Sequence, residues 1–103
     1  MSDPMRIRAN LVNSSIEVKL MIKHPMESGF RKGEDGQRIP AHFIETLVVR
    51  CKDHIVLDAY LGLAISENPY IAFHFTGAAK GDDIAVTWVD NLGASRTDRA
   101  VVT

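Results

Sequence analysis

Residues 15–23 read SIEVKLMIK, and this stretch decides the fold class. Every second residue is a branched aliphatic, and most of the residues between are charged. The aliphatic positions are Ile16, Val18, Leu20 and Ile22. An extended chain turns successive side chains to opposite faces, so this pattern predicts a strand with one buried face.

The same alternation recurs along the chain, in residues 5–11, 55–61, 71–75, 84–89 and 95–102. Turn-forming residues separate the segments at 13–14, 52–53 and 90–93. The apolar residues of 40–51 fit a helical stripe, but the β-branched side chains in this segment favour a further strand. About seven short strands in 103 residues predict a single all-β domain, residues 1–103, with the architecture of an immunoglobulin-like β-sandwich.

Residues 24–40 do not alternate. They contain three glycines and a proline near each end, which predicts a long loop or a splayed hairpin. Loops of this length in a compact domain are usually functional or mobile.

Composition excludes several classes of protein. The net charge of −1 and the pI near 6.4 argue against a nucleic-acid binder, which needs a basic face. No apolar run approaches the roughly 18 residues of a membrane span. One cysteine, Cys51, excludes an intrachain disulfide. Residues 1–10 lack the apolar segment of a signal peptide, so on its own the chain is expected in the cytoplasm.

The four histidines and the cysteine are candidate ligands for a metal ion. Cys51 and His54 form a Cys-x-x-His step, and His24 and His42 add two imidazoles. The set weakly resembles that of superoxide reductases, which bind iron through four histidines and a cysteine. That family keeps its Cys-x-x-His step near the C-terminus, however, whereas here it lies mid-chain. The prediction is therefore scattered histidines at the surface, with no metal and no cofactor.

No catalytic residue is predicted. Serine, histidine and aspartate show no recognisable triad spacing. Residues 77–82 are glycine-rich with a lysine, but they lack the strand–loop–helix context of a phosphate loop. Cys51 is expected to be a small buried hydrophobe, and Trp88 a core residue.

Several blocks in a fixed order resemble the SoxZ family. They are HPMESG at 24–29, RK at 31–32, IPAHFI at 39–44, NPY at 68–70, GAAKGD at 77–82, and TWVDNLG at 87–93, preceded by DPMRIR at 3–8. The resemblance covers nearly the whole chain, and Cys51 is the one position without a place in the family pattern.

The resemblance implies a non-catalytic subunit that pairs with SoxY in the sulfur-carrier complex of thiosulfate oxidation. In that family a cysteine at the flexible C-terminus of SoxY carries the sulfur intermediate. A c-type cytochrome, a sulfate-releasing hydrolase and a sulfane dehydrogenase act on it. The resemblance also implies a periplasmic location, reached by export together with SoxY. The alternatives are an iron-binding protein like superoxide reductase and a generic interaction domain.

Two groups of residues are expected to form contact surfaces. Aromatic and imidazole side chains at loop and strand-start positions are the candidates for the SoxY interface: Phe30, His42, Phe43 and Tyr70. The long loop is the candidate docking surface for the pathway enzymes, through His24, Pro25, Met26 and Glu27.

Overall fold

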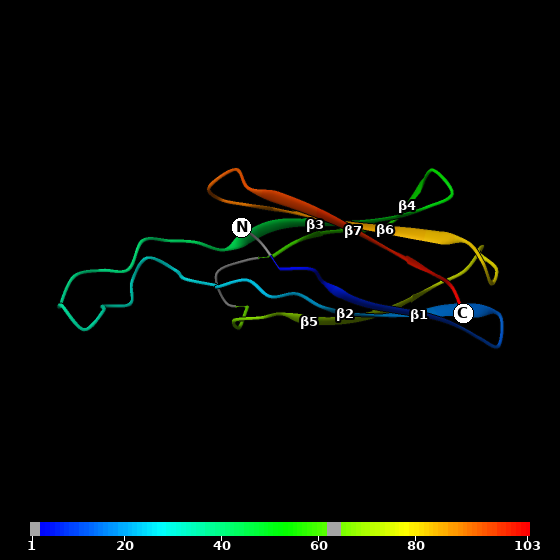
Figure 1. Ribbon diagram of the computed structural model, residues 1–103, viewed down its shortest axis with the longest axis horizontal. Coiled ribbons are helices and arrows are strands. Elements are labelled where there is room, and N and C mark those ends of the chain that lie inside the picture. The colour runs from blue at the N-terminus through cyan, green and yellow to red at the C-terminus, as the bar shows by residue number, and fades with distance from the viewer. Residues whose placement is uncertain (1–2, 62–64) are drawn as a thin grey trace.

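The computed structural model describes residues 3–61 and 65–103, and within them the protein is all-β. The strands are β1 (Arg6–Val12), β2 (Ser15–Met21), β3 (Ile44–Cys51), β4 (His54–Tyr60), β5 (Tyr70–Phe75), β6 (Asp83–Asp90) and β7 (Ser95–Val101). They form two antiparallel sheets, one ordered β1-β2-β5 and the other β4-β3-β6-β7 (Figure 1). The predicted sandwich is confirmed.

The core lies between the two sheets and consists of the inward positions of the alternating strands. Ile16, Val18 and Leu20 of β2 face Leu47 and other aliphatic residues of the opposite sheet, and all of them are almost fully buried. Trp88 on β6 is 2% exposed, as predicted for a core residue.

The ambiguous segment 40–51 forms a strand from Ile44 onward, as predicted, while residues 40–43 lie outside it. β3 is the central strand between β4 and β6, and its pairing with β6 is irregular between Ile44 and Thr46. The backbone N–H and C=O groups of β3 are therefore hydrogen-bonded to strands on both sides. Its β-branched side chains are of the kind that favours such a strand.

Residues 24–43 form a splayed hairpin. Its two arms meet at isolated bridges that pair Glu27 with His42 and Lys32 with Arg38. Figure 1 shows the hairpin projecting from one end of the sandwich, and the molecule measures 52 × 22 × 20 Å. Of the two alternatives that the sequence left open, the hairpin is correct.

The described residues include no helix that could cross a membrane.

Candidate functional site

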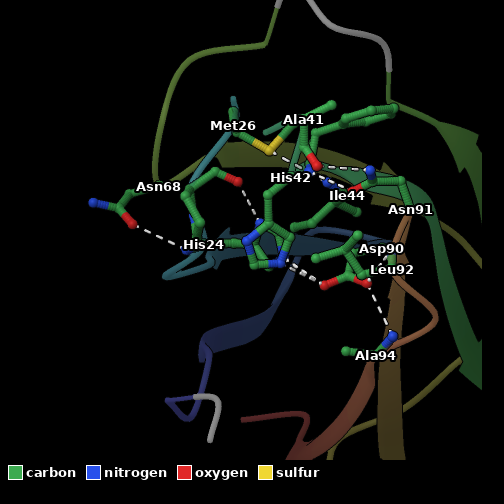
Figure 2. Close-up of polar contacts among 12 residues, drawn as sticks. His24, Met26, Ala41, His42, Ile44, Asn68, Asp90, Asn91, Leu92 and Ala94 are labelled. Atoms are coloured by element: carbon green, nitrogen blue, oxygen red, sulfur yellow. Dashed lines mark hydrogen bonds and ion pairs between the residues drawn. The ribbon is translucent and has the colours of Figure 1, made fainter. Parts of the chain in front are cut away.

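A pocket of about 440 Å³ lies at the end of the sandwich from which the hairpin projects. Its wall includes His24, which follows β2, Trp88 and Asp90 of β6, and His42 from the returning arm of the hairpin. We call the cluster of His24, His42 and Asp90 the histidine end. Figure 2 shows the two imidazole rings and the carboxylate converging.

Asp90 is placed by β6 and by the turn that follows it. Ile84, Val86 and Trp88 point inward along the strand, and Asp90 is the next inward position. Its Oδ1 accepts hydrogen bonds from the amides of Leu92 (3.0 Å) and Ala94 (2.9 Å). One carboxylate oxygen thus fixes the turn, which leaves Oδ2 to face the pocket.

His24 is placed by β2 in the same way. The inward alternation of β2 continues through Ile22 to His24, which is 5% exposed. The His24 amide donates to Asn68 Oδ1 at 3.0 Å, and the Asn68 amide donates to the His24 carbonyl oxygen at 3.0 Å. These bonds continue the β2–β5 pairing beyond the ends of the strands and hold the imidazole inside the sandwich.

His42 comes from the returning arm of the hairpin. It exchanges two backbone hydrogen bonds with Glu27, at 2.8 and 2.9 Å. Asn91 fixes the flanking residues: its Nδ2 donates to the Ala41 carbonyl oxygen (2.9 Å), and its Oδ1 accepts from the Phe43 amide (2.8 Å). The side chain of His42 is 36% exposed, so its ring forms the solvent-facing side of the site.

The two imidazoles share one carboxylate oxygen. Nε2 of His24 and Nε2 of His42 each lie 3.0 Å from Asp90 Oδ2, and the ring centroids are 4.6 Å apart. Burial raises the pKa of Asp90, but hydrogen bonds from both histidines and from the Ala94 and Leu92 amides outweigh burial. The net result is a pKa below the ordinary value, so Asp90 is a carboxylate at neutral pH.

Trp88 forms the inner wall of the site. Its ring packs edge-on against His24, with centroids 4.8 Å apart. Its indole nitrogen is buried and has no hydrogen-bond partner in the described part of the chain. A buried N–H without a hydrogen-bond partner lowers the stability of the folded state, so this donor adds a free-energy cost at the wall of the pocket.

The structure corrects the expectation of four scattered surface histidines. His24 and His42 meet at Asp90, and His24 is buried, whereas the sequence reading placed it on the loop surface. The cause is that the alternation of β2 continues past the strand into the hairpin. His54 and His74 are exposed on other strands, as expected for surface histidines.

The other members of the proposed docking surface differ in exposure. Pro25 is exposed, while Met26 and Glu27 are half-buried. Met26 packs against the core, and its Sδ accepts from the Ile44 amide at 3.5 Å. Glu27 pairs with Arg31. Pro25 is therefore the most accessible residue of this group.

The candidate interface residues lie on different elements. Phe30 is 72% exposed on the hairpin, with the Arg38 guanidinium 6.0 Å from its ring centroid. Tyr70 is 59% exposed at the start of β5, where it pairs with Met21 of β2. Phe43 is half-buried beside the site. Exposed aromatic side chains fit a partner surface, and their role remains a prediction.

Cys51 lies at the opposite end of the sandwich, which we call the thiol end. It closes β3 before the turn at Lys52 and Asp53, and it is 4% exposed, as predicted. Burial, reinforced by the negative charge of Asp82, raises the pKa of the thiol. The length of β3 separates it from the histidine end by roughly 20 Å, given about 3.3 Å per residue. Cys51 therefore does not join His24 and His42.

Asp90 and Asn91 are site residues that the sequence pattern does not predict, because residues 90–93 have the composition of a turn. One signal could have found Asp90: the period-two pattern of β6 points it inward, one step beyond Trp88. A charged residue at an inward position next to a core tryptophan requires a partner.

Comparison with known proteins identifies a family and a similar fold. The profile of the SoxZ family, described as "Sulphur oxidation protein SoxZ", matches residues 5–101. Among solved structures, the chain is similar to a superoxide reductase (neelaredoxin) from Archaeoglobus fulgidus, an E12V variant in the reduced form. The TM-score is 0.61 at 14% identity, over 99% of this chain and 87% of that one. The comparison with curated proteins returned no match.

The likeness to neelaredoxin shows a shared sandwich fold and nothing about chemistry, because the identity is low. The family match covers nearly all of the chain, from the start of β1 to the end of β7. It agrees with the resemblance seen in the sequence blocks at both arms of the hairpin and at the β6–β7 turn. This protein belongs to the SoxZ family, and it is a subunit of the Sox sulfur-oxidation system.

Proposed function

We propose that this chain is the non-catalytic subunit of a sulfur-carrier complex, and that it pairs with SoxY, whose C-terminal cysteine carries the sulfur intermediate. One observation supports this most directly: in a chain of a sulfur-oxidation family, the single cysteine is buried within the sandwich. This burial supports a cargo carried on another chain.

A carrier thiol has two physical requirements that Cys51 does not meet. It must reach several active sites in turn, which needs a flexible tether, and its thiolate must be open to attack. Cys51 is held between β4 and β6 by paired backbone, and burial raises its pKa away from the thiolate form. The rigid sandwich suits the role of a recognition body that supports a mobile arm on its partner.

The histidine end does not supply an obvious nucleophile. The pocket wall formed by residues in the described ranges includes no serine, threonine or cysteine beside His24 and His42. Nucleophilic catalysis by a histidine and aspartate pair requires such a group within hydrogen-bond reach. This supports a non-catalytic role.

Phe30, His42, Phe43 and Tyr70 are our candidates for contacting SoxY. A standard interface of roughly 1,600 Å² usually depends on a few aromatic anchors. The high exposure of Phe30 and Tyr70 leaves most of each side chain available for such a contact. The c-type cytochrome, the hydrolase and the sulfane dehydrogenase would then meet the complex in the periplasm, after its export with SoxY.

The pairing can be tested by co-expressing the chain with SoxY and measuring complex mass by light scattering after size exclusion. A one-to-one complex is expected, with affinity reduced at least about 10-fold by Phe30→Ser or Tyr70→Ser. Ile55→Ser is the matched control, because Ile55 is 53% exposed but lies near the thiol end. A chain that ignores SoxY would instead be a generic interaction domain.

The carrier assignment is tested by mass spectrometry after thiosulfate-dependent turnover. The sulfur adduct is expected on SoxY, and Cys51→Ser is expected to leave turnover unchanged. An adduct mapped to Cys51, or loss of turnover in Cys51→Ser with the complex intact, would show that the carrier thiol is on this chain.

A further inference from the structure

We propose that His24, His42 and Asp90 bind one divalent transition-metal ion, with Zn²⁺ and Fe²⁺ as the fitting class. The three side chains each offer one donor atom, and these atoms lie within 4.8 Å of one another. Two imidazoles and a carboxylate are the donor set of zinc and non-haem iron(II) sites. This reverses the sequence-based expectation of no metal, because that expectation rested on separated histidines.

The orientation of the His24 ring is the first argument. Its Nδ1 contacts the Pro25 carbonyl oxygen, so Nε2 is the ring atom that points to Asp90, 3.0 Å from Oδ2. Nε2 of His42 lies 3.0 Å from the same oxygen. Two imidazole nitrogens and one carboxylate oxygen thus converge on one small space, where a metal ion would replace the protons of the two hydrogen bonds.

The geometry fits a metal ion. Donors bound at about 2.1 Å to a common ion, with angles between 90° and 109°, lie about 3.0–3.4 Å apart. Both Nε2–Oδ2 distances are 3.0 Å. The donor atoms of the set lie up to 4.8 Å apart, so binding requires a shift of one imidazole ring. His42 is the more exposed of the two histidines and has the more room to move.

The groups around the donors match those that orient metal ligands elsewhere. A metal-binding histidine usually donates its other N–H to a carbonyl or carboxylate, and here Pro25 accepts it. The second oxygen of Asp90 is fixed by the two turn amides. The pocket gives an ion a route to the three donor atoms.

Trp88 supplies a built-in probe. It is the only tryptophan, and its ring lies 4.8 Å from the His24 ring. A paramagnetic ion such as Co²⁺ bound beside His24 is expected to quench its fluorescence, and Zn²⁺ is expected to compete for the same site. The signal reports on the site itself and requires no activity.

The test uses the full chain, alone or in its complex with SoxY, after removal of bound metal with a chelator. Titration with Co²⁺ is expected to show one ion per chain, a visible absorption band and quenching of Trp88. His42→Ala is expected to weaken binding by at least about 100-fold, because deleting a ligand exceeds the 10–100-fold effect of an outer-shell change. His54→Ala, an exposed histidine near the thiol end, is the matched control and is expected to bind normally.

Three results would overturn the proposal. The first is no stoichiometric binding of Co²⁺ or Zn²⁺ up to about 1 mM. The second is equal loss of binding in His54→Ala and His42→Ala. The third is a Trp88 signal that does not change when Co²⁺ or Zn²⁺ is added, which would leave hydrogen bonding as the whole role of the cluster. If circular dichroism shows that His42→Ala does not fold, Asp90→Asn replaces it as the variant that removes a metal ligand. Its amide oxygen can still accept the hydrogen bonds of the turn. Pairing with SoxY is measured separately, so either proposal can fail alone.

Discussion

The two ends of the sandwich both bury ionisable side chains, but one end surrounds them with polar groups and the other with apolar residues. At the histidine end, the Asp90 carboxylate meets two imidazoles and two turn amides, beside an open pocket. At the thiol end, Cys51 packs in the hydrophobic core, and burial keeps it protonated. Burial alone therefore does not mark a functional site. The number of polar groups that converge on a buried side chain is the better indicator.

The largest difference between the ends is expected from Asp90→Ala. The substitution leaves buried His24 and the amides of Leu92 and Ala94 without their acceptor. Removing one member of a buried charged network costs about 3–5 kcal/mol. Urea unfolding in the presence of a chelator measures the loss, and Asp58→Ala on exposed β4 serves as control. A loss below about 1 kcal/mol would remove the distinction between the two ends.

A smaller loss is expected at the thiol end. Cys51→Ser places a hydroxyl in an apolar setting, where an unpaired polar group costs about 1–3 kcal/mol. Cys51→Ala, measured by the same urea unfolding, separates the polarity of the serine from the loss of sulfur volume. If the serine variant is as stable as the wild type, water reaches this position and the end is not apolar.

The thiol end should also show itself at alkaline pH. The pKa of Cys51 is raised in the folded state. The buried, protonated thiol therefore stabilises the folded state fully at pH values below the ordinary thiol pKa of about 8.5. This stabilisation is lost as pH rises through the higher pKa of the folded state. The difference in unfolding free energy between wild type and Cys51→Ser should therefore shrink above about pH 8.5. A disulfide reagent should react with the folded thiol at least about 10-fold more slowly than with the unfolded chain. Equal rates would contradict burial.

The smallest effect is expected from Phe30→Ser in the isolated chain. Phe30 is 72% exposed, and changes at such surface positions usually alter stability by less than about 0.5 kcal/mol. Thermal unfolding of the isolated chain measures this. A larger loss would mean that the contact between Phe30 and Arg38 supports the hairpin, and Phe30→Ser would then be a poor test of partner binding.

The fold could be predicted because it depends on a local pattern. Alternation in residues 15–23 and 84–89 identifies both the strands and their buried faces, and the turn at Lys52 and Asp53 needs only residues that tolerate positive φ. The histidine end was harder to predict from the sequence. His24 and Asp90 follow from extending the alternation by one residue on β2 and β6.

His42 could not be placed in this way. Its position depends on the register of the hairpin, which is set by the bridge between Glu27 and His42 and by Asn91, far away in the chain. The local sequence does not specify the register in which the second arm of a long hairpin pairs with the first. The meeting of His24 and His42 is therefore a property of the tertiary structure.

The projecting hairpin leaves the sandwich at His24 and returns at His42, so both of its roots rest on Asp90 (Figure 2). One carboxylate oxygen of Asp90 thus contacts both the first and the last part of the hairpin. The tip of the hairpin is the turn at residues 33–37, beyond the bridge between Lys32 and Arg38. The orientation of the hairpin and the geometry of the pocket therefore depend on the same hydrogen bonds to Asp90.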